Sequence, residues 1–521
     1  MTVATSGPID LDALTLDDVR SGGLRGRPVA VLGFARTGIA LARFFADAGA
    51  SVTVYDARPM GELAPAIGAL GDRPVRLMLG PEVDPPAAWA EAALVAASPS
   101  INPDFPTAEP RLRAALGDLV ERRRDGDRAA PPLVSEPELF LRLCPAPTIG
   151  VTGTKGKTTT ASMSAAVLGA DPSHPAILGG NIGTPLVERL PELTERHRVV
   201  IELSELQLPT MSHGTTVAVY TNVTSDHLDR HGSLSAYRAV KRRLAELVDP
   251  DGALVLNAED PVVAAYAGLG TVPSVMYRRE RPMPGGLGIV EGWIVAAGVQ
   301  RLPLAGGGAA ATGPGGRILP VDELAIPGAH NRSNALAAVA VGLLFGVAPD
   351  AIRAAAAAFE GVEHRLESVA LIDGVRFVND SQGTQPDAVV AALRAFEAPV
   401  VLIAGGRDKG IDLSELGPVA AERAVAAVVI GESGPRLAGI FLAAGLATVE
   451  TAATMDEAVR RADALAREAL EARGPAVEPA TVLLSPAAAS FDMFVDYAAR
   501  GRAFKSVVAE IAAERGRGGQ R

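Results

Sequence analysis

The residues whose types and spacing have the clearest chemistry lie at 150–160, in the run GVTGTKGKTTT. An apolar segment at 147–149 precedes the run, and an Ala/Ser-rich segment typical of a helix follows at 160–168. This order of strand, glycine loop and helix is the context of a phosphate-binding loop, in which backbone N–H groups and a helix N-terminus surround phosphate oxygens. Lys157 would reach the β- and γ-phosphates, and Thr158 would bind Mg²⁺. The sequence therefore predicts an ATP site.

The spacing of this loop departs from the standard pattern. That pattern has four residues between the first glycine and Gly-Lys, and in this register Val151 stands where the first glycine belongs. The segment from Gly153 to Thr158 is a tighter variant. The alternative interpretation is a glycine turn before a helix without a nucleotide. Lys155 is a second cation in the loop, and its side chain would contact phosphate or point to solvent.

Composition limits the class of protein and the compartment. A length of 521 residues predicts about three domains, and the net charge of −11 argues against a general nucleic-acid binder. The single cysteine, Cys144, excludes an internal disulfide and fits a reducing cytoplasm. The N-terminus lacks a secretory signal. The apolar segment 334–347 is shorter than the roughly 20 residues of a membrane span, so we expect a buried helix and a cytoplasmic protein without a membrane partner.

Alternation of strands and helices predicts an α/β fold with parallel sheets. We expect three domains: a Rossmann-like N-terminal domain, a P-loop-type central ATPase domain and a Rossmann-like C-terminal domain. A Gly-rich stretch at 282–320 predicts a loop or hairpin insertion. The expected boundaries are a tail at 1–25, domains at 26–143, 144–361 and 362–512, and a disordered tail at 513–521. The predicted strands are 28–33, 51–56, 93–98, 199–203, 217–221, 253–257, 375–379, 400–404, 427–431 and 481–485, and helices are expected at 37–48 and 236–247.

The first domain carries a second glycine motif. The run GFARTG at 33–38 follows a predicted strand and opens a predicted helix, and Asp56 ends the next strand. This resembles the dinucleotide-binding fingerprint, but Ala35 occupies the second glycine position, where close approach of a pyrophosphate normally requires glycine. We therefore favour a nucleotide-linked substrate over NAD(P) in this domain.

Polar residues after the central strands are candidates for metal chemistry. Glu202 ends an apolar strand, where a metal-binding acid would lie, although an exposed strand-end glutamate is the alternative. His227 follows another strand within TNVTSDHLD, and imidazole beside carboxylates suits a divalent cation. Lys241 on the helix at 236–247 would by itself be a surface residue. Asn331 and Asn334 open a further helix, where they would cap it or contact a nucleotide.

Taken together, the motifs resemble the Mur ligases of peptidoglycan synthesis. The resemblance covers nearly the whole chain, and its motifs occur in order: TGTKGKTT, GGNIGTP, IELSELQL, TNVTSDHLDRH, YRAVK, GAHNRSNALAA, VEHRLE, NDSQGT and LLSPAAASFDMF. It implies an ATP-dependent amide ligase that adds glutamate, with D-glutamate favoured, to UDP-N-acetylmuramoyl-L-alanine through an acyl phosphate. The alternatives are L-glutamate, another Mur or folylpolyglutamate-type ligase, and an ATPase that makes no amide bond.

The resemblance also implies a role for each matching residue and a monomer that acts on small molecules. Lys157, His227 and Lys241 would be catalytic, and two Mg²⁺ ions would bind Thr158, Glu202, His227 and a carbamylated Lys241. The ATP contacts would be Gly153, Thr154, Lys155, Gly156, Lys157, Thr158, Thr159, Asn331, Asn334, Arg365 and Asp380. The UDP-linked substrate would contact Thr37, Asp56, Arg58, Ser98, Asn181, Ser204 and Gln207. Glutamate would contact Thr384, Lys409, Ser490, Phe491 and Tyr497.

Two departures from the family pattern generate a hypothesis. The usual NDSKAT reads NDSQGT, so Gln382 replaces a lysine, and Lys155 replaces an asparagine in the phosphate loop. We hypothesise that Lys155 supplies the cation that is missing at residue 382. The double change Lys155→Asn with Gln382→Lys should then retain much more ATP-dependent amide synthesis than Lys155→Asn alone. Equal losses in the two variants, measured as phosphate release, would contradict the hypothesis.

Overall fold

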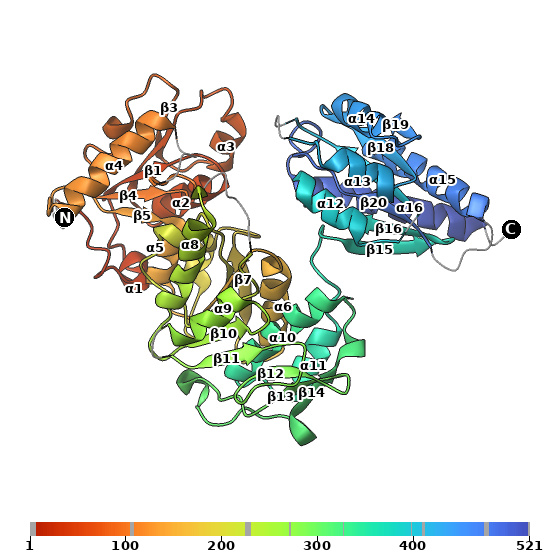
Figure 1. Cartoon of the computed structure of the whole chain (residues 1–521). Helices are drawn as coiled ribbons and strands as arrows, with labels where there is room; N and C mark the ends of the chain where they lie inside the picture. The colour runs from red at the N-terminus through yellow and green to blue at the C-terminus, as the bar shows by residue number, and fades with distance from the viewer. Residues whose placement is uncertain are drawn as a thin grey trace. The chain divides into compact units, whose positions relative to one another are not determined.

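The computed structural model in Figure 1 divides the chain into two compact units, residues 1–359 and 360–521. The structure describes residues 7–104, 109–224, 231–269, 272–326, 328–397, 399–408, 412–473 and 479–518. Three sheets, mostly parallel and flanked by helices, form the cores, which confirms the expected α/β class. Each strand that the sequence predicts is present, with its ends shifted by one residue at most.

The N-terminal sheet is parallel, in the order β3-β2-β1-β4-β5. The chain leaves β1 to build one side of the sheet and returns to build the other, so the carboxyl ends of β1 and β4 flank a topological switch point, where open α/β sheets bind ligands. The elements are β1 Pro28–Leu32, α2 Arg36–Asp47, β2 Ser51–Asp56, α3 Ala64–Ala69, β3 Val75–Leu79, η1 Pro85–Ala88, β4 Leu94–Ala97, α4 Pro110–Arg124, β5 Leu133–Ser135 and α5 Glu136–Leu143.

Residues 7–25 are part of the fold, which corrects the expectation of a tail for this part of the chain. Leu16 and Val19 lie on the short helix α1, Leu16–Arg20, and both are buried in the apolar core of the first unit. Arg20 donates hydrogen bonds to the backbone oxygens of Pro191 and Leu193. The segment is polar enough to read as a tail, and only these tertiary contacts show that it is anchored.

The central sheet has the order β14-β13-β12-β11-β10-β9-β6-β8-β7. Its β6 lies between β8 and β9 in the parallel part, and α6 follows it. The Gly-rich stretch forms the antiparallel strands β12 to β14 at one edge, which confirms a hairpin insertion. The strands are β6 Thr148–Thr152, β7 Ala176–Gly180, β8 Arg198–Glu202, β9 Val217–Tyr220, β10 Ala253–Asn257, β11 Ser274–Tyr277, β12 Leu287–Val290, β13 Trp293–Ala296 and β14 Arg317–Pro320.

Helices α6 and α10 pack against each other over the central sheet (Figure 1). The apolar segment of α10 is buried along its length from Asn334 to Leu344, as the sequence predicts. Among the described helices, none is long and apolar enough to cross a membrane. The helical segments are α6 Lys157–Gly169, η2 Leu186–Glu192, η3 Leu208–Thr210, α8 Leu234–Glu246, α9 Pro261–Ala264, η4 Ala265–Gly268, η5 Pro303–Ala305, η6 Pro314–Gly316, η7 Val321–Glu323, α10 Ala329–Leu344 and α11 Pro349–Ala357.

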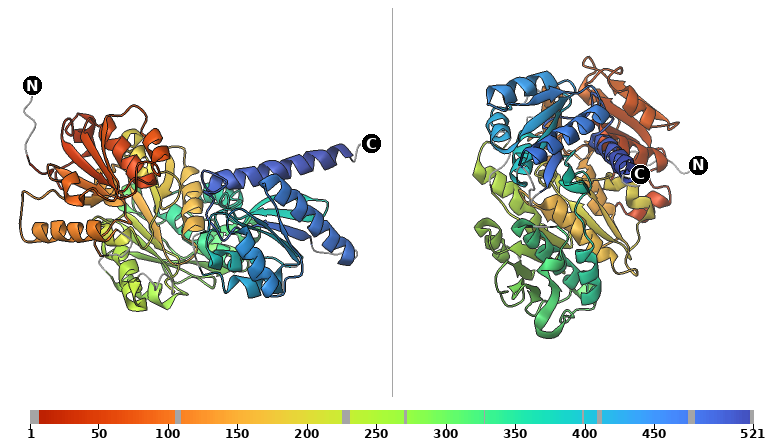
Figure 2. Two further views of the ribbon diagram at one scale, coloured as in Figure 1. Left: turned by 90° about the horizontal axis from the view of Figure 1, so that it is seen from above. Right: turned by 90° about the vertical axis from the view of Figure 1, so that its right-hand side faces the viewer.

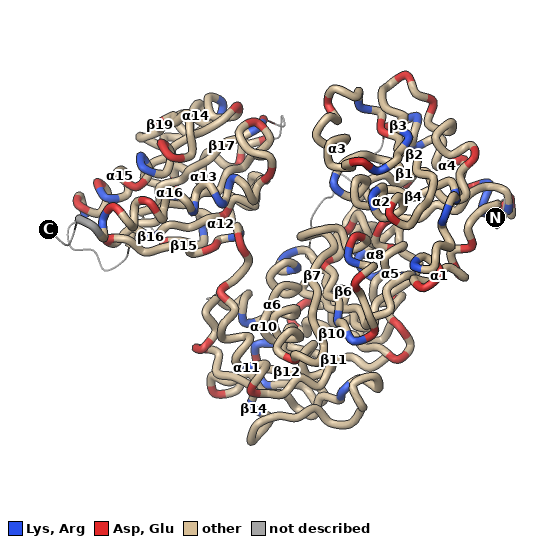
Figure 3. Tube along the Cα trace, turned by 180° about the vertical axis from the view of Figure 1, so that it is seen from behind, with Lys and Arg blue, Asp and Glu red and all other residues tan. Residues whose placement is uncertain are grey.

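The second unit contains a sheet in the order β15-β16-β20-β17-β18-β19, parallel except for the β15–β16 pair. Its last helix, α16, is drawn in blue in Figure 2 and continues to Gly518, so most of the expected disordered tail is helical. Figure 3 shows acidic and basic residues interspersed along both units. The elements are β15 Glu367–Ile372, β16 Val375–Asn379, α12 Pro386–Arg394, β17 Val400–Gly405, α13 Leu416–Arg423, β18 Ala426–Ile430, α14 Gly434–Ala443, β19 Val449–Thr451, α15 Met455–Arg473, β20 Ala480–Leu484 and α16 Tyr497–Gly518.

Candidate active site

The predicted phosphate loop joins β6 to α6 through two glycines in conformations that other residues rarely adopt. Gly153 has φ of 149° and Gly156 has φ of 86°. A Cβ atom at Gly153 would lie 2.0 Å from Thr221 Oγ1, and one at Gly156 would lie 2.7 Å from Asn334 Oδ1. Glycine is therefore required at both positions, because each combines a positive φ with close packing against a neighbouring segment.

The segment that follows β9, at 221–224, holds this loop in place. The Thr154 N–H donates to the Asn222 carbonyl at 2.8 Å, and the Lys155 N–H donates to Asn222 Oδ1 at 2.9 Å. Thr221 Oγ1 donates to the Lys155 carbonyl at 2.7 Å. These hydrogen bonds with protein groups fix the path of the loop between β6 and α6.

The side chains predicted to contact ATP in the first unit gather at the N-termini of α6 and α10. Lys157 Nζ lies 2.9 Å from the Thr154 carbonyl and donates to it. Thr160 Oγ1 donates to Asn334 Oδ1 at 3.1 Å, and Asn334 Nδ2 donates to Asn331 Oδ1 at 3.2 Å. The asparagines of α10 therefore lie beside the phosphate loop, where two helix N-termini would favour an anion.

Glu202, at the end of β8, has an unusual environment for a carboxylate. Its side chain is 2% exposed, and Oε1 accepts a hydrogen bond from Asn181 Nδ2 at 3.1 Å. Its Oε2 is buried and has no hydrogen-bond partner among the described residues. A buried carboxylate oxygen without a donor is costly unless a cation occupies its lone pairs, and carboxylate oxygen is a preferred ligand of Mg²⁺. The residue therefore fits the predicted metal-binding role.

Lys241 is fully buried, which corrects the interpretation of this residue by itself as a surface lysine. Its Nζ donates to Thr152 Oγ1 at 3.2 Å and lies 5.6 Å from the ring centroid of Tyr237. The Tyr237 hydroxyl in turn lies 3.0 Å from Thr154 Oγ1. Sequence reasoning missed Tyr237 and Thr152, although Tyr237 and Lys241 are four residues apart and share one face of α8.

The residues predicted to bind the UDP-linked substrate in the N-terminal domain lie at the carboxyl edge of its sheet. Asp56 accepts a hydrogen bond from the Phe34 N–H at 2.8 Å and forms an ion pair with Arg58. Burial raises the pKa of the Asp56 carboxyl, but hydrogen bonds from Arg58 and Phe34 outweigh burial and leave the pKa lowered. Ser98 Oγ lies 3.2 Å from Ser100 Oγ, and Thr37 is half-buried in the first turn of α2.

Ser204 and Gln207 form a buried pair after β8. Gln207 Oε1 accepts hydrogen bonds from both the backbone N–H and the hydroxyl of Ser204, each at 2.9 Å. The pair follows Glu202 directly in the chain, so it lies at the same edge of the central sheet. This placement fits residues near the reactive end of a substrate.

In the second unit, the predicted ATP and glutamate residues lie near the carboxyl ends of β16 and β20. Asp380 accepts hydrogen bonds from Ser485 Oγ at 2.7 Å and from the Leu366 N–H at 3.2 Å. Burial raises the pKa of the Asp380 carboxyl to about 6. The remaining residues differ in exposure: Ser490 is buried, Thr384 and Tyr497 are half-buried, Arg365 is half-buried, and Phe491 is 66% exposed.

Arg500 on α16 is a buried residue of this region that sequence reasoning missed. Its guanidinium donates to Ser381 Oγ, to the Ser381 carbonyl and to the Ala488 carbonyl at 2.9 to 3.1 Å. Burial lowers the pKa of this guanidinium to about 10. The contacts tie together the loops that follow β16 and β20, and nothing in the run YAARGRAF distinguishes this arginine from a surface one.

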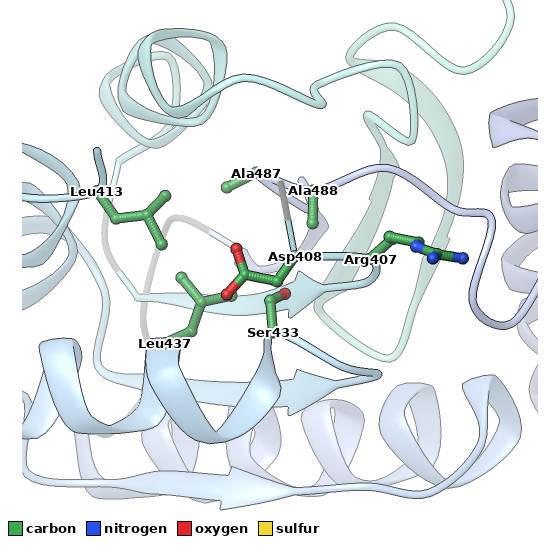
Figure 4. Close-up of a pocket in the computed structure, with 7 residues that line it drawn as sticks. All are labelled: Arg407, Asp408, Leu413, Ser433, Leu437, Ala487 and Ala488. Atoms are coloured by element: carbon green, nitrogen blue, oxygen red, sulfur yellow. The ribbon is translucent and has the colours of Figure 1, made fainter. Parts of the chain in front are cut away.

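The small pocket drawn in Figure 4 has too little room for a substrate. It lies beyond β17 and β18 and is lined by Asp408, Leu413, Ser433 and Leu437, among others. Its volume is about 10 Å³, which is room for a single water molecule. The Ser433 hydroxyl is buried and has no hydrogen-bond partner among the described residues.

Two predicted site residues, His227 and Lys409, lie outside the residues that the structure describes.

Asp380 generates a prediction about stability and pH. Because its folded-state pKa of about 6 lies above the ordinary 3.8, the buried protonated carboxyl stabilises the fold at low pH, and this contribution is lost as pH rises through 6. The ionised form should cost about 3 kcal/mol at neutral pH. We expect Asp380→Asn to increase hydrogen-exchange protection of β16 and β20 at pH about 8 and to have little effect at pH about 4.

The exposed Asp373 of the same unit provides the control. Asp373→Asn should leave the pH dependence of protection in β16 and β20 unchanged, since its side chain is 66% exposed. A pH dependence of the wild type that survives unchanged in Asp380→Asn would contradict the assignment to Asp380.

Comparisons with protein families and with curated relatives indicate the same family of ligases. Residues 151–342 match the Mur ligase middle domain, and residues 364–487 match the Mur ligase, glutamate ligase domain. Two curated relatives are named UDP-N-acetylmuramoylalanine–D-glutamate ligase. The relative from Symbiobacterium thermophilum is 38% identical over 92% of this chain and 97% of its own length. The relative from Pelotomaculum thermopropionicum is 36% identical over 93% and 98%.

Solved structures agree on the fold. UDP-N-acetylmuramate-alanine ligase MurC from Thermotoga maritima superposes with a TM-score of 0.53 at 19% identity, covering 93% of this chain and 99% of that chain. MurF from Acinetobacter baumannii gives a TM-score of 0.50 at 16% identity, covering 93% of both chains. At these identities the likeness shows the three-domain α/β architecture alone. Because the curated relatives are 36 and 38% identical to this chain over almost their full length, the chain belongs to the Mur ligase family.

Proposed function

We propose that this chain is the ATP-dependent ligase that joins glutamate to UDP-N-acetylmuramoyl-L-alanine in peptidoglycan precursor synthesis. It would act on small molecules as a monomer in the cytoplasm, and D-glutamate is the favoured amino acid. The observation that carries the proposal is the buried Glu202 at the end of β8, in a sheet whose neighbouring strand β6 ends in the phosphate loop. The names of the curated relatives support the choice of acceptor and amino acid.

The reaction needs an activated acceptor because a carboxylate is a poor electrophile. The alanyl carboxylate would take the γ-phosphoryl group of ATP, so that a P–O bond of ATP breaks and an acyl phosphate forms. The glutamate amine would attack the acyl carbon, lose a proton, and expel inorganic phosphate as the amide bond forms. Negative charge develops on oxygen in both steps, so catalysis depends on fixed positive groups and on positioning.

Residues of the phosphate loop and α10 would bind ATP. Because Asn222 accepts hydrogen bonds from the Thr154 and Lys155 N–H groups, the backbone from Gly156 to Thr159 at the start of α6 would face the phosphates. The Lys157 ammonium would move from the Thr154 carbonyl to the phosphate oxygens. Asn331 and Asn334 would contact the nucleotide from the start of α10. Arg365 and Asp380 are the proposed ATP contacts of the second unit.

Thr158, Glu202, His227 and a carbamylated Lys241 are the proposed holders of Mg²⁺, with two ions in the site. Bound Mg²⁺ would neutralise charge on the phosphates and on the transferred group. Lys241 is a candidate for carbamylation because its fully buried amine lies beside the end of β6, at Thr152. The carbamate would replace a buried cation by a carboxylate on the same side chain.

The remaining proposed contacts divide between the two other substrates. Thr37, Asp56, Arg58 and Ser98 would bind the nucleotide part of the acceptor at the switch point of the N-terminal sheet. Asn181, Ser204 and Gln207 would position its reactive end. Glutamate would contact Thr384, Lys409, Ser490, Phe491 and Tyr497, with the Lys409 ammonium attracting a carboxylate.

The proposal is tested by phosphate release from ATP with UDP-N-acetylmuramoyl-L-alanine and either D- or L-glutamate. We expect release that requires both the acceptor and glutamate, is faster with D-glutamate, and is accompanied by the amide product in mass spectra. A preference for L-glutamate would revise the amino acid. Phosphate release that is independent of glutamate would contradict the ligase assignment.

Carbamylation of Lys241 predicts a dependence on CO₂. Removal of dissolved CO₂ and bicarbonate should lower the ligase rate about tenfold, and added bicarbonate should restore it, because a lost metal ligand costs about this much or more. Isotopically labelled bicarbonate should give a carbamate carbon signal by NMR that disappears in Lys241→Ala. The control Lys505→Ala, which changes a lysine paired with Glu363 and Glu367, should retain the signal. A signal that persists in Lys241→Ala would refute the assignment.

A further inference from the structure

Arg36, the fourth residue of the run GFARTG, connects two loops that are far apart in sequence. It is the first residue of α2, directly after the glycine loop that follows β1. Its Nη1 donates to the Gly183 carbonyl at 3.1 Å, and its Nη2 donates to the Asn181 carbonyl at 3.3 Å. The two acceptors belong to the segment that follows β7 in the central sheet. One guanidinium therefore joins the N-terminal sheet to the loop of the central sheet that carries Asn181.

Asn181 is held on its other side by Glu202. The Asn181 backbone N–H donates to the Glu202 carbonyl at 2.9 Å, and its Nδ2 donates to Glu202 Oε1 at 3.1 Å. The approach is so close that a Cβ atom at Gly180 would lie 2.4 Å from the Glu202 carbonyl oxygen. Asn181 is thus held by Arg36 through its backbone carbonyl and bonds the Glu202 carboxylate through its side chain. The other oxygen of this carboxylate, Oε2, has no hydrogen-bond partner among the described residues.

A second arginine on the same face of α2 allows the contact of Arg36 with Asn181 to be distinguished from the general packing of α2 against the central domain. Arg43 lies two turns after Arg36, and its Nη1 forms an ion pair with Glu188 at 3.1 Å. Arg43 also donates to the Ala69 carbonyl through Nε at 2.8 Å. These contacts hold α2 against η2, and among the described hydrogen bonds and ion pairs of Arg43 none reaches Asn181 or Glu202. Arg43 therefore serves as a matched control.

We propose that Arg36 is a positioning residue for the ligase reaction, which fixes the segment 181–183 and thereby orients the Glu202 carboxylate through Asn181. The proposal rests on the proposed function, since it takes Glu202 as a ligand of Mg²⁺. Groups that orient a ligating carboxylate change metal affinity and activity about 10- to 100-fold when they are removed. A planar guanidinium suits the task because its two nitrogens reach two carbonyl oxygens at once.

The experiment compares Arg36→Ala, Arg36→Lys and Arg43→Ala with the wild type in two assays. The first is the ligase rate as a function of each substrate and of Mg²⁺. The second is binding of Mn²⁺, as a paramagnetic substitute for Mg²⁺, to the protein without ATP, followed by electron paramagnetic resonance. We expect Arg36→Ala to lower kcat about tenfold and weaken Mn²⁺ binding several-fold. Arg36→Lys should recover part of both losses, and Arg43→Ala should stay within about twofold of the wild type.

A double-mutant cycle tests the route through Asn181. If Arg36 acts through this residue, Arg36→Ala should have little further effect in an Asn181→Ala background, so the two losses will not add. Additive losses would overturn the route. A change confined to the KM for the UDP-linked substrate, with unchanged kcat and Mn²⁺ binding, would make Arg36 a direct substrate contact instead.

Failure of the proposed function is distinguishable from failure of this inference. A wild-type chain that makes no amide would refute the function, whereas Mn²⁺ binding would still report the effect of Arg36 on the Glu202 site. Equal loss of Mn²⁺ binding in Arg36→Ala and Arg43→Ala would show that docking of α2, rather than the bridge to Asn181, is responsible.

Discussion

Close approach of backbone segments at the carboxyl edge of the central sheet is the constraint on which the candidate site depends. Gly153 lies where a Cβ atom would be 2.0 Å from Thr221 Oγ1, and Gly180 lies where one would be 2.4 Å from the Glu202 carbonyl. These contacts bring the phosphate loop, the end of β9 and the segment after β7 around the end of β8. Any side chain at either glycine would push these segments apart, and the groups that face the ligands would move with them.

The charged groups at this edge and in the second unit carry a cost in stability. Glu202, Lys241, Asp380 and Arg500 are all almost completely buried, and burial of charge is unfavourable unless partners compensate. Arg500 is compensated by carbonyl and hydroxyl oxygens, whereas Glu202 Oε2 has no described partner. We interpret Arg500 as a structural cation whose hydrogen-bond acceptors are supplied by the protein. We interpret Glu202 as a carboxylate whose second oxygen would bind a metal cation.

Part of the fold and site could be predicted from local sequence. Strands such as 253–257 are continuous apolar runs, which mark buried parallel strands, and the phosphate loop is recognisable because its glycines, lysine and threonine are consecutive. For strands β12 to β14 the sequence predicts only a Gly-rich loop or hairpin insertion, because the short segments are interrupted by turns. For residues 7–25 the sequence predicts a tail because the apolar side chains are few, and their burial depends on a core that includes residues distant in sequence.

The sequence by itself determined the types of chemistry and their order along the chain: a phosphate loop, an acid at a strand end, and family motifs that assign ATP-dependent amide synthesis. Only the tertiary structure decided that Lys241 and Arg500 are buried, that Tyr237 reaches Thr154, and that the exposed Arg36 bridges two loops. The physical reason is that burial and bridging depend on which strand ends are neighbours in a sheet. The order of the strands, with β6 between β8 and β9, is set by long-range packing and cannot be predicted from a short segment of sequence.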